Sequence, residues 1–134
     1  MLQDDFVPAP PDLLPVRGQD KISELKTRRV QLVVRCQDLA RFLRDHEEVV
    51  WARWIDARVT EISLGQPEGV CNLLAGFTGI GNIGDVFLCE EAGHCVSPGD
   101  ETAINEQFLL LLSAVNTHAH DVQRLIQPVA VRRR

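Results

Sequence analysis

The sequence predicts a mainly α fold, an antiparallel helical bundle that carries a glycine-rich loop and one small β-hairpin. Three observations lead to this fold class. Apolar residues recur at helical spacing through three long stretches of the chain. Glycine and proline interrupt the chain between those stretches. A length of 134 residues, with 45% hydrophobic and 25% charged residues, is typical of one soluble globular domain.

We expect a single helical domain over residues 18–128, flanked by two tails. Several prolines in residues 1–17 remove backbone donors and block helix formation, so this segment is predicted to be a flexible tail. Residues 129–134 end in three arginines and predict a basic C-terminal tail. The N-terminus is acidic and lacks the apolar run of a secretory signal. We therefore expect a cytoplasmic protein with reduced thiols and no membrane span.

The first two helices are predicted on either side of a short connection. Asp20 is the expected N-cap of a helix that runs to about Arg44, and a second helix follows His46 and ends near Gly65. The connection is too short for anything but an antiparallel pair or a kinked continuation. Their apolar stripes contain Ile22, Leu25, Leu32, Val33, Cys36, Leu39, Ala40 and Leu43, then Trp51, Trp54, Ile55, Val59 and Ile62.

A short third helix is expected over residues 68–74, followed by a glycine-rich loop over residues 76–85 that no regular helix tolerates. Apolar residues 86–89 predict a strand and residues 94–96 a return strand, joined by a turn at residues 90–93. Such a hairpin is marginal alone and needs the helices for support. The last helix is predicted from about Glu101 to Gln127, packed back on the first two.

The charge distribution is the strongest functional signal. The net charge is -5, yet no Lys or Arg occurs between Val59 and Gln123. Acidic residues in that stretch are Glu61, Glu68, Asp85, Glu90, Glu91, Asp100, Glu101, Glu106 and Asp121. A surface of one sign repels nucleic acid and anionic membranes and attracts a basic protein. The alternative is an acidic surface that serves solubility without a partner.

We predict that part of this acidic surface contacts a partner. On the last helix, Leu109 and Leu110 lie off the core stripe, and exposed apolar residues among carboxylates suit a binder of a basic protein. The predicted contact residues are Asp85, Glu90, Glu91, Asp100, Glu101, Glu106, Leu109 and Leu110.

Nucleotide chemistry is not favoured by the glycine-rich loop. Residues 79–84 match the G-x-G-x-x-G string, but the expected strand after them offers no helix N-terminus to a pyrophosphate. Asp85 would also repel a phosphate. We interpret the loop as a close-packed turn in which glycine permits positive φ.

Metal and nucleophile chemistry also lack a specific motif. No C-x2-C pair exists, and His94 and Cys95 are neighbours that point to opposite faces of a strand, with Cys89 across the turn. In a chain with four cysteines and four histidines, a Cys/His pair can easily lie close together by chance. We expect no metal, no cofactor and no enzymatic activity. The alternatives are a small enzyme or metal- or nucleotide-binding protein that uses the loop and hairpin, or a DNA-binding regulator that uses the arginines of the first helix.

The segment from Phe77 to Leu88, with the sequence FTGIGNIGDVFL between helices, resembles a small bacterial domain family of unknown function. Members of that family carry a Phe-Gly-Gly-Met-Gly-Ser-apolar-Asn-Asp segment that leads into a short strand. The resemblance covers residues 40–125 and departs from the pattern at Thr78, Ile80, Asn82 and Gly84. Families of this layout are similar to the immunity proteins encoded beside secreted bacterial toxins.

The resemblance and the charge together predict a cytoplasmic immunity protein, or antitoxin. Such a toxin inhibitor would bind a basic effector, plausibly a nuclease, through its acidic surface. Because a nuclease must hold phosphates, its active surface is positive, and carboxylates can occupy the same positions. This mechanism requires protein–protein interaction and no catalytic residue.

Overall fold

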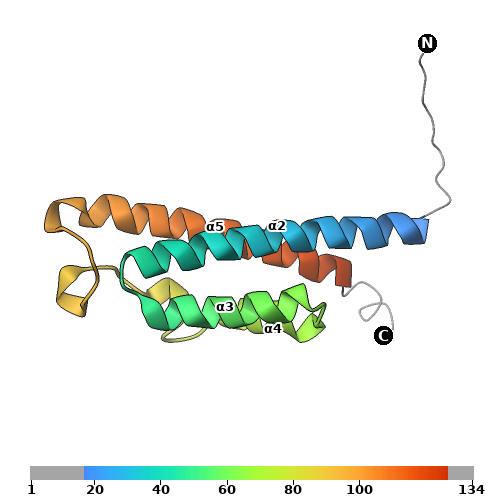
Figure 1. Ribbon diagram of the computed structural model, residues 1–134, viewed down its shortest axis with the longest axis horizontal. Helices are drawn as coiled ribbons and strands as arrows, with labels where there is room; N and C mark the ends of the chain where they lie inside the picture. The colour runs from blue at the N-terminus through green and yellow to red at the C-terminus, as the bar shows by residue number, and fades with distance from the viewer. Residues whose placement is uncertain (1–16, 127–134) are drawn as a thin grey trace, which may run out of the picture.

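The computed structural model describes residues 17–126, which form four helices and three short 3-10 turns (Figure 1). The helices are α2 (Arg17–Asp45), α3 (Val49–Ser63), α4 (Pro67–Ala75) and α5 (Glu101–Ile126). Between α4 and α5 lie the turns η2 (Ile83–Asp85), η3 (Glu90–Ala92) and η4 (Pro98–Asp100). The mainly α class is therefore confirmed. The predicted tails fall outside the described residues, except that Arg17 already belongs to α2.

The long helices α2 and α5 lie side by side, and α3 and α4 cover one flank of the pair (Figure 1). The chain reverses direction after α2, after α3 and again after α4. Both the α2–α3 turn and the segment that joins α4 to α5 therefore lie at the same end of the bundle. This shared end positions the candidate site.

Local signals account for most helix boundaries. The α3 helix begins after Glu48, whose side-chain Oε2 accepts the Trp51 backbone N–H at 3.3 Å, and α4 begins with Pro67 in its first turn. The prediction that Asp20 caps the first helix is wrong, because α2 already begins at Arg17. An acidic side chain suits the first turn of a helix as well as its cap, so Asp20 did not fix the start.

One apolar core joins the four helices. Each helix buries its stripe completely at several positions, and fully burying one such side chain contributes about 1.5–3 kcal/mol. The largest fully buried side chains are Phe108, Leu32, Leu39, Leu43, Ile55, Ile62, Leu73, Ile83, Leu88, Val115, Val122 and Cys36. Two of these, Ile83 and Leu88, come from the α4–α5 segment and anchor it to the bundle. Over residues 17–126, no helix combines the length and apolar character needed to cross a membrane.

The predicted β-hairpin is not present in residues 17–126, where no strand occurs. The backbone is extended at Val86 and Cys89, but its polar groups are satisfied without a strand ladder. The Asn105 side chain binds both the N–H and the C=O of Leu88, at 2.8 and 2.9 Å. The Cys95 N–H donates to the His46 carbonyl at 3.0 Å instead of to residues 86–89. The apolar run at residues 86–89 instead anchors the segment to the helices through the buried Leu88, and a run of this length cannot by itself be distinguished from a strand.

Candidate functional site

The candidate site is the end of the bundle where the α2–α3 turn meets the α4–α5 segment. We name it the acidic end and define it by the carboxylates of Asp45, Glu47, Glu90, Glu91, Asp100 and Glu101. The hydrogen bond from Cys95 N–H to His46 C=O joins the two parts directly. The Phe42 carbonyl in turn lies 2.8 Å from His46 Nδ1, which holds the turn against α2.

A buried histidine fixes the α4–α5 segment to the start of α3. The His94 side chain is 7% exposed, and its Nε2 lies 2.8 Å from Glu48 Oε1. Its Nδ1 lies 3.0 Å from the Cys89 backbone N. Because a backbone N–H can only donate, Nδ1 accepts, and the proton sits on Nε2 and is donated to the carboxylate. Both ring nitrogens are occupied, so His94 is a structural clamp with no free lone pair for base catalysis.

A second clamp attaches the same segment to α5. Besides binding Leu88, the Asn105 amide donates to the Glu101 carbonyl at 2.9 Å. The turn η3 closes with Gly93 at φ 91°, a left-handed conformation that favours glycine. The acidic turns are therefore held by buried contacts on both sides, and the carboxylates of η3 and η4 project from a fixed backbone.

Most of the acidic stretch has no internal counter-charge. Between residues 59 and 123, Arg58 pairs with Glu61, and Arg28 and Arg124 pair with Asp121. Two hydrogen bonds from Arg58 hold the pKa of the Glu61 carboxyl below its ordinary range. Within the part of the chain that the structure describes, the other carboxylates of that stretch form no ion pair with Lys or Arg: Glu68, Asp85, Glu90, Glu91, Asp100, Glu101 and Glu106.

A shallow depression of about 350 Å³ opens at the acidic end. Its lining includes Glu90 from η3, Asp100 from η4 and Ile104 from α5, together with the clamp residue His94. Two carboxylates around a partly apolar floor suit the guanidinium and stem of an arginine or the stem and ammonium of a lysine.

The remaining predicted contact residues lie outside this depression. Asp85 belongs to the glycine-rich loop, and Glu106 is on the second turn of α5. Leu109 and Leu110 are 57% and 72% exposed and lie about 12–14 Å along α5 from Glu101, at 1.5 Å per residue. The structure therefore brings Glu90, Glu91, Asp100 and Glu101 together and places the other predicted residues on adjoining surfaces.

The glycine-rich loop is closed on itself. Asp85 Oδ2 accepts the Gly81 N–H at 2.8 Å, and Asn82 Oδ1 accepts the Gly84 N–H at 2.6 Å. The N–H groups of Gly81 and Gly84, two of those that could cradle a phosphate, are thus already satisfied, and the loop leads into a single 3-10 turn instead of a helix. Its geometry gives no support to nucleotide binding. Gly79 and Gly81 have φ of 86° and 77° and leave Ile80 between them fully exposed.

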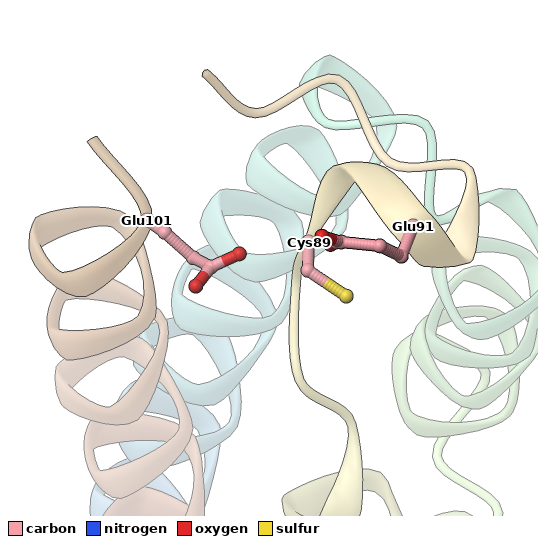
Figure 2. Close-up of side chains that lie close together, drawn as sticks. All are labelled: Cys89, Glu91 and Glu101. Carbon is pink, nitrogen blue, oxygen red and sulfur yellow. The ribbon is translucent and has the colours of Figure 1, made fainter. Parts of the chain in front are cut away.

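Three potential metal ligands converge at the acidic end (Figure 2). Cys89 Sγ and one carboxylate oxygen each of Glu91 and Glu101 all lie within 4.8 Å of one another. The sequence suggested Cys89, His94 and Cys95 as possible ligands, but His94 is bonded to Glu48 and Cys95 is exposed. The sequence feature that marks the observed group is a Cys-x-Glu spacing in a turn, followed by a glutamate at the start of the next helix.

The sequence analysis also omitted Asp45 and Glu47. Both precede α3, and Glu47 adopts a left-handed φ of 66° in the turn. Four helices that alternate in direction place the first and third connections at one end. The expected topology alone would have placed these two carboxylates beside residues 90–101.

Comparison with protein-family models, with curated proteins and with solved structures found no match to this chain.

Proposed function

We propose that this protein is an immunity protein that binds and neutralises a basic bacterial effector toxin through the acidic end. The observation that carries the proposal is the group of carboxylates on η3, η4 and the start of α5 without a Lys or Arg partner in residues 17–126. Repulsion between neighbouring carboxylates destabilises a fold, and a cationic partner relieves that repulsion when it binds.

The rigidity of the acidic end supports binding. The clamps at His94 and Asn105 hold η3 and the chain before α5 without using the carboxylates of Glu90 or Asp100. A pre-formed surface loses little conformational entropy when it binds. The depression between Glu90 and Asp100 provides a receptor for one basic side chain of the partner.

The proposed inhibition is competition for a charged surface. A nuclease holds its substrate by Lys and Arg contacts to phosphates. When carboxylates of the acidic end occupy those contacts, the substrate is excluded without chemistry from this chain. Exposed charge pairs mainly raise the association rate, so we expect association to slow as salt increases. The glycine-loop resemblance to a family similar to immunity proteins points in the same direction.

The test first establishes whether a reading frame next to the gene encodes an effector domain, which the proposal requires, and then uses that domain. Wild-type protein is expected to rescue cells that express this domain and to bind it in titration calorimetry. The double variant Glu90→Lys/Asp100→Lys should weaken binding by about tenfold or more at low salt, since it reverses two charges at the interface. The control Glu24→Lys/Glu68→Lys reverses two exposed charges on α2 and α4, away from the acidic end, and should bind as wild type.

The proposal fails if the wild-type protein neither rescues growth nor binds the effector. It also fails in its site assignment if both double variants weaken binding equally. Circular dichroism of each variant separates lost binding from lost folding.

A further inference from the structure

We infer that Cys89, Glu91 and Glu101 form a binding site for a divalent cation of the zinc class. Their donor atoms, one sulfur and two carboxylate oxygens, lie within 4.8 Å of one another. Figure 2 shows the Glu101 side chain extending from α5 toward the turn that carries Cys89 and Glu91. Glu91 and Glu101 also belong to the acidic end, but the inference rests on the geometry of the three ligands and is tested without the toxin partner.

The distances fit a small tetrahedral ion after a modest closure. With a Zn–S bond of about 2.3 Å and Zn–O bonds of about 2.1 Å, tetrahedral ligand atoms are about 3.4–3.6 Å apart. A contraction of up to about 1.2–1.4 Å from the 4.8 Å limit is within reach of side-chain rotation of two glutamates. Three protein ligands leave a fourth position to water, as in other three-ligand zinc sites.

The backbone around the ligands is fixed by contacts that do not involve the donor atoms. The Cys89 N–H is held by His94, and its carbonyl accepts the N–H groups of Ala92 and His94 at 3.2 and 3.1 Å. Glu101 is the first residue of α5, and its carbonyl is bound by Asn105. The turn and α5 therefore hold the three ligand residues in fixed positions relative to one another. Hydrogen bonds around the ligands of known metal sites have the same effect.

The mixed donor set selects the metal. A thiolate is a soft ligand that disfavours Mg²⁺ and Ca²⁺, whereas zinc accepts sulfur and carboxylate oxygen together. Two carboxylates and a thiol that loses its proton to solvent on binding also supply the negative charge that a divalent ion neutralises. The described chain offers no Lys or Arg ion pair to Glu91 or Glu101 that the metal would have to displace.

The test measures metal binding by the isolated full-length protein. Zn²⁺ titration calorimetry should give about one saturable site per chain, and Co²⁺ should give a thiolate-to-cobalt charge-transfer band in the near ultraviolet. Cys89→Ser should abolish that band, and Glu101→Gln should weaken Zn²⁺ binding by at least about tenfold. Cys95→Ser and Glu106→Gln change the same residue types outside the cluster and should leave both signals intact.

Three results would overturn the assignment. The first is the lack of saturable Zn²⁺ binding by folded wild-type protein. The second is a charge-transfer band that survives Cys89→Ser or is lost in Cys95→Ser. The third is displacement of Zn²⁺ by Ca²⁺ or Mg²⁺ at comparable concentrations, which would indicate a carboxylate site without the thiolate. None of these results involves the toxin partner, so the proposed function stands or falls separately on Glu90 and Asp100.

Discussion

Replacement of His94 by alanine is expected to destabilise the protein by about 2–4 kcal/mol. The substitution removes the bond from Nε2–H to the Glu48 carboxylate and the bond from Cys89 N–H to Nδ1. A hydrogen bond to a charged group contributes about 1.5–3 kcal/mol and a neutral one about 0.5–1.5 kcal/mol. Against a typical total stability of 5–15 kcal/mol, the loss is large for one side chain that lies outside the apolar core.

A double-mutant cycle isolates the free energy of interaction between His94 and Glu48. Glu48→Ala also removes the cap of α3 at Trp51, but this loss occurs with and without His94 and cancels in the cycle. We expect a coupling energy of about 1–3 kcal/mol from urea unfolding of the two single variants and the double variant. Nitrogen-15 spectra of the His94 ring should show the proton on Nε2.

Additive single variants, with a coupling below about 0.5 kcal/mol, would contradict the clamp. A proton on Nδ1 would contradict it as well, because Nδ1 must accept from Cys89. Either result would remove one of the two clamps that hold the acidic end and leave only the Asn105 bonds.

Three further perturbations test the packing and the titrating groups. Gly76→Ala places a Cβ in a steric clash with the Trp54 ring and should lower the free energy of unfolding in urea by about 1–3 kcal/mol, whereas Gly99→Ala, with open space around it, should leave the midpoint unchanged. Burial raises the pKa of the Cys36 thiol to about 12, so the unfolded state alone ionises from about pH 9 upward. As the pH rises from about 9 to about 12, the free energy of unfolding should therefore fall more steeply in wild type than in Cys36→Ala. The lowered pKa of Glu61 adds stability above the ordinary carboxyl range that is lost as pH falls, so Glu61→Gln should be less stable than wild type at neutral pH, and equal stability there would refute the bond.

All four predicted helices are present, and the short helix expected over residues 68–74 corresponds to α4 (Pro67–Ala75). The helices predicted to end near Arg44, near Gly65 and near Gln127 correspond to α2, α3 and α5 within a few residues. Arg58, one turn after Trp54 on α3, places its guanidinium carbon 5.1 Å from the centroid of the Trp54 ring. These features follow from residues one to four positions apart, so the sequence encodes them locally.

The structure of the α4–α5 segment depends on contacts between residues far apart in the sequence. Its four-residue apolar run was predicted as a strand, yet its backbone is bound by Asn105, which lies 17 residues away from Leu88. The bond between His94 and Glu48 spans 46 residues. No local pattern relates such positions, and a short apolar run cannot by itself distinguish a strand from a segment packed on helices.

The same reasoning separates the acidic residues into two groups. Glu48 has a structural role, because one carboxylate oxygen binds His94 and the other caps the first turn of α3. The side-chain carboxylates of Glu90 and Asp100 accept no hydrogen bond within residues 17–126, although both residues line the depression at the acidic end. Substitution of such residues by neutral ones would relieve repulsion without breaking any contact in the described fold. Asp100 also complements the N-terminus of α5, whereas the Glu90 carboxylate has no such internal role, which agrees with the proposal that it meets a cation from outside the chain.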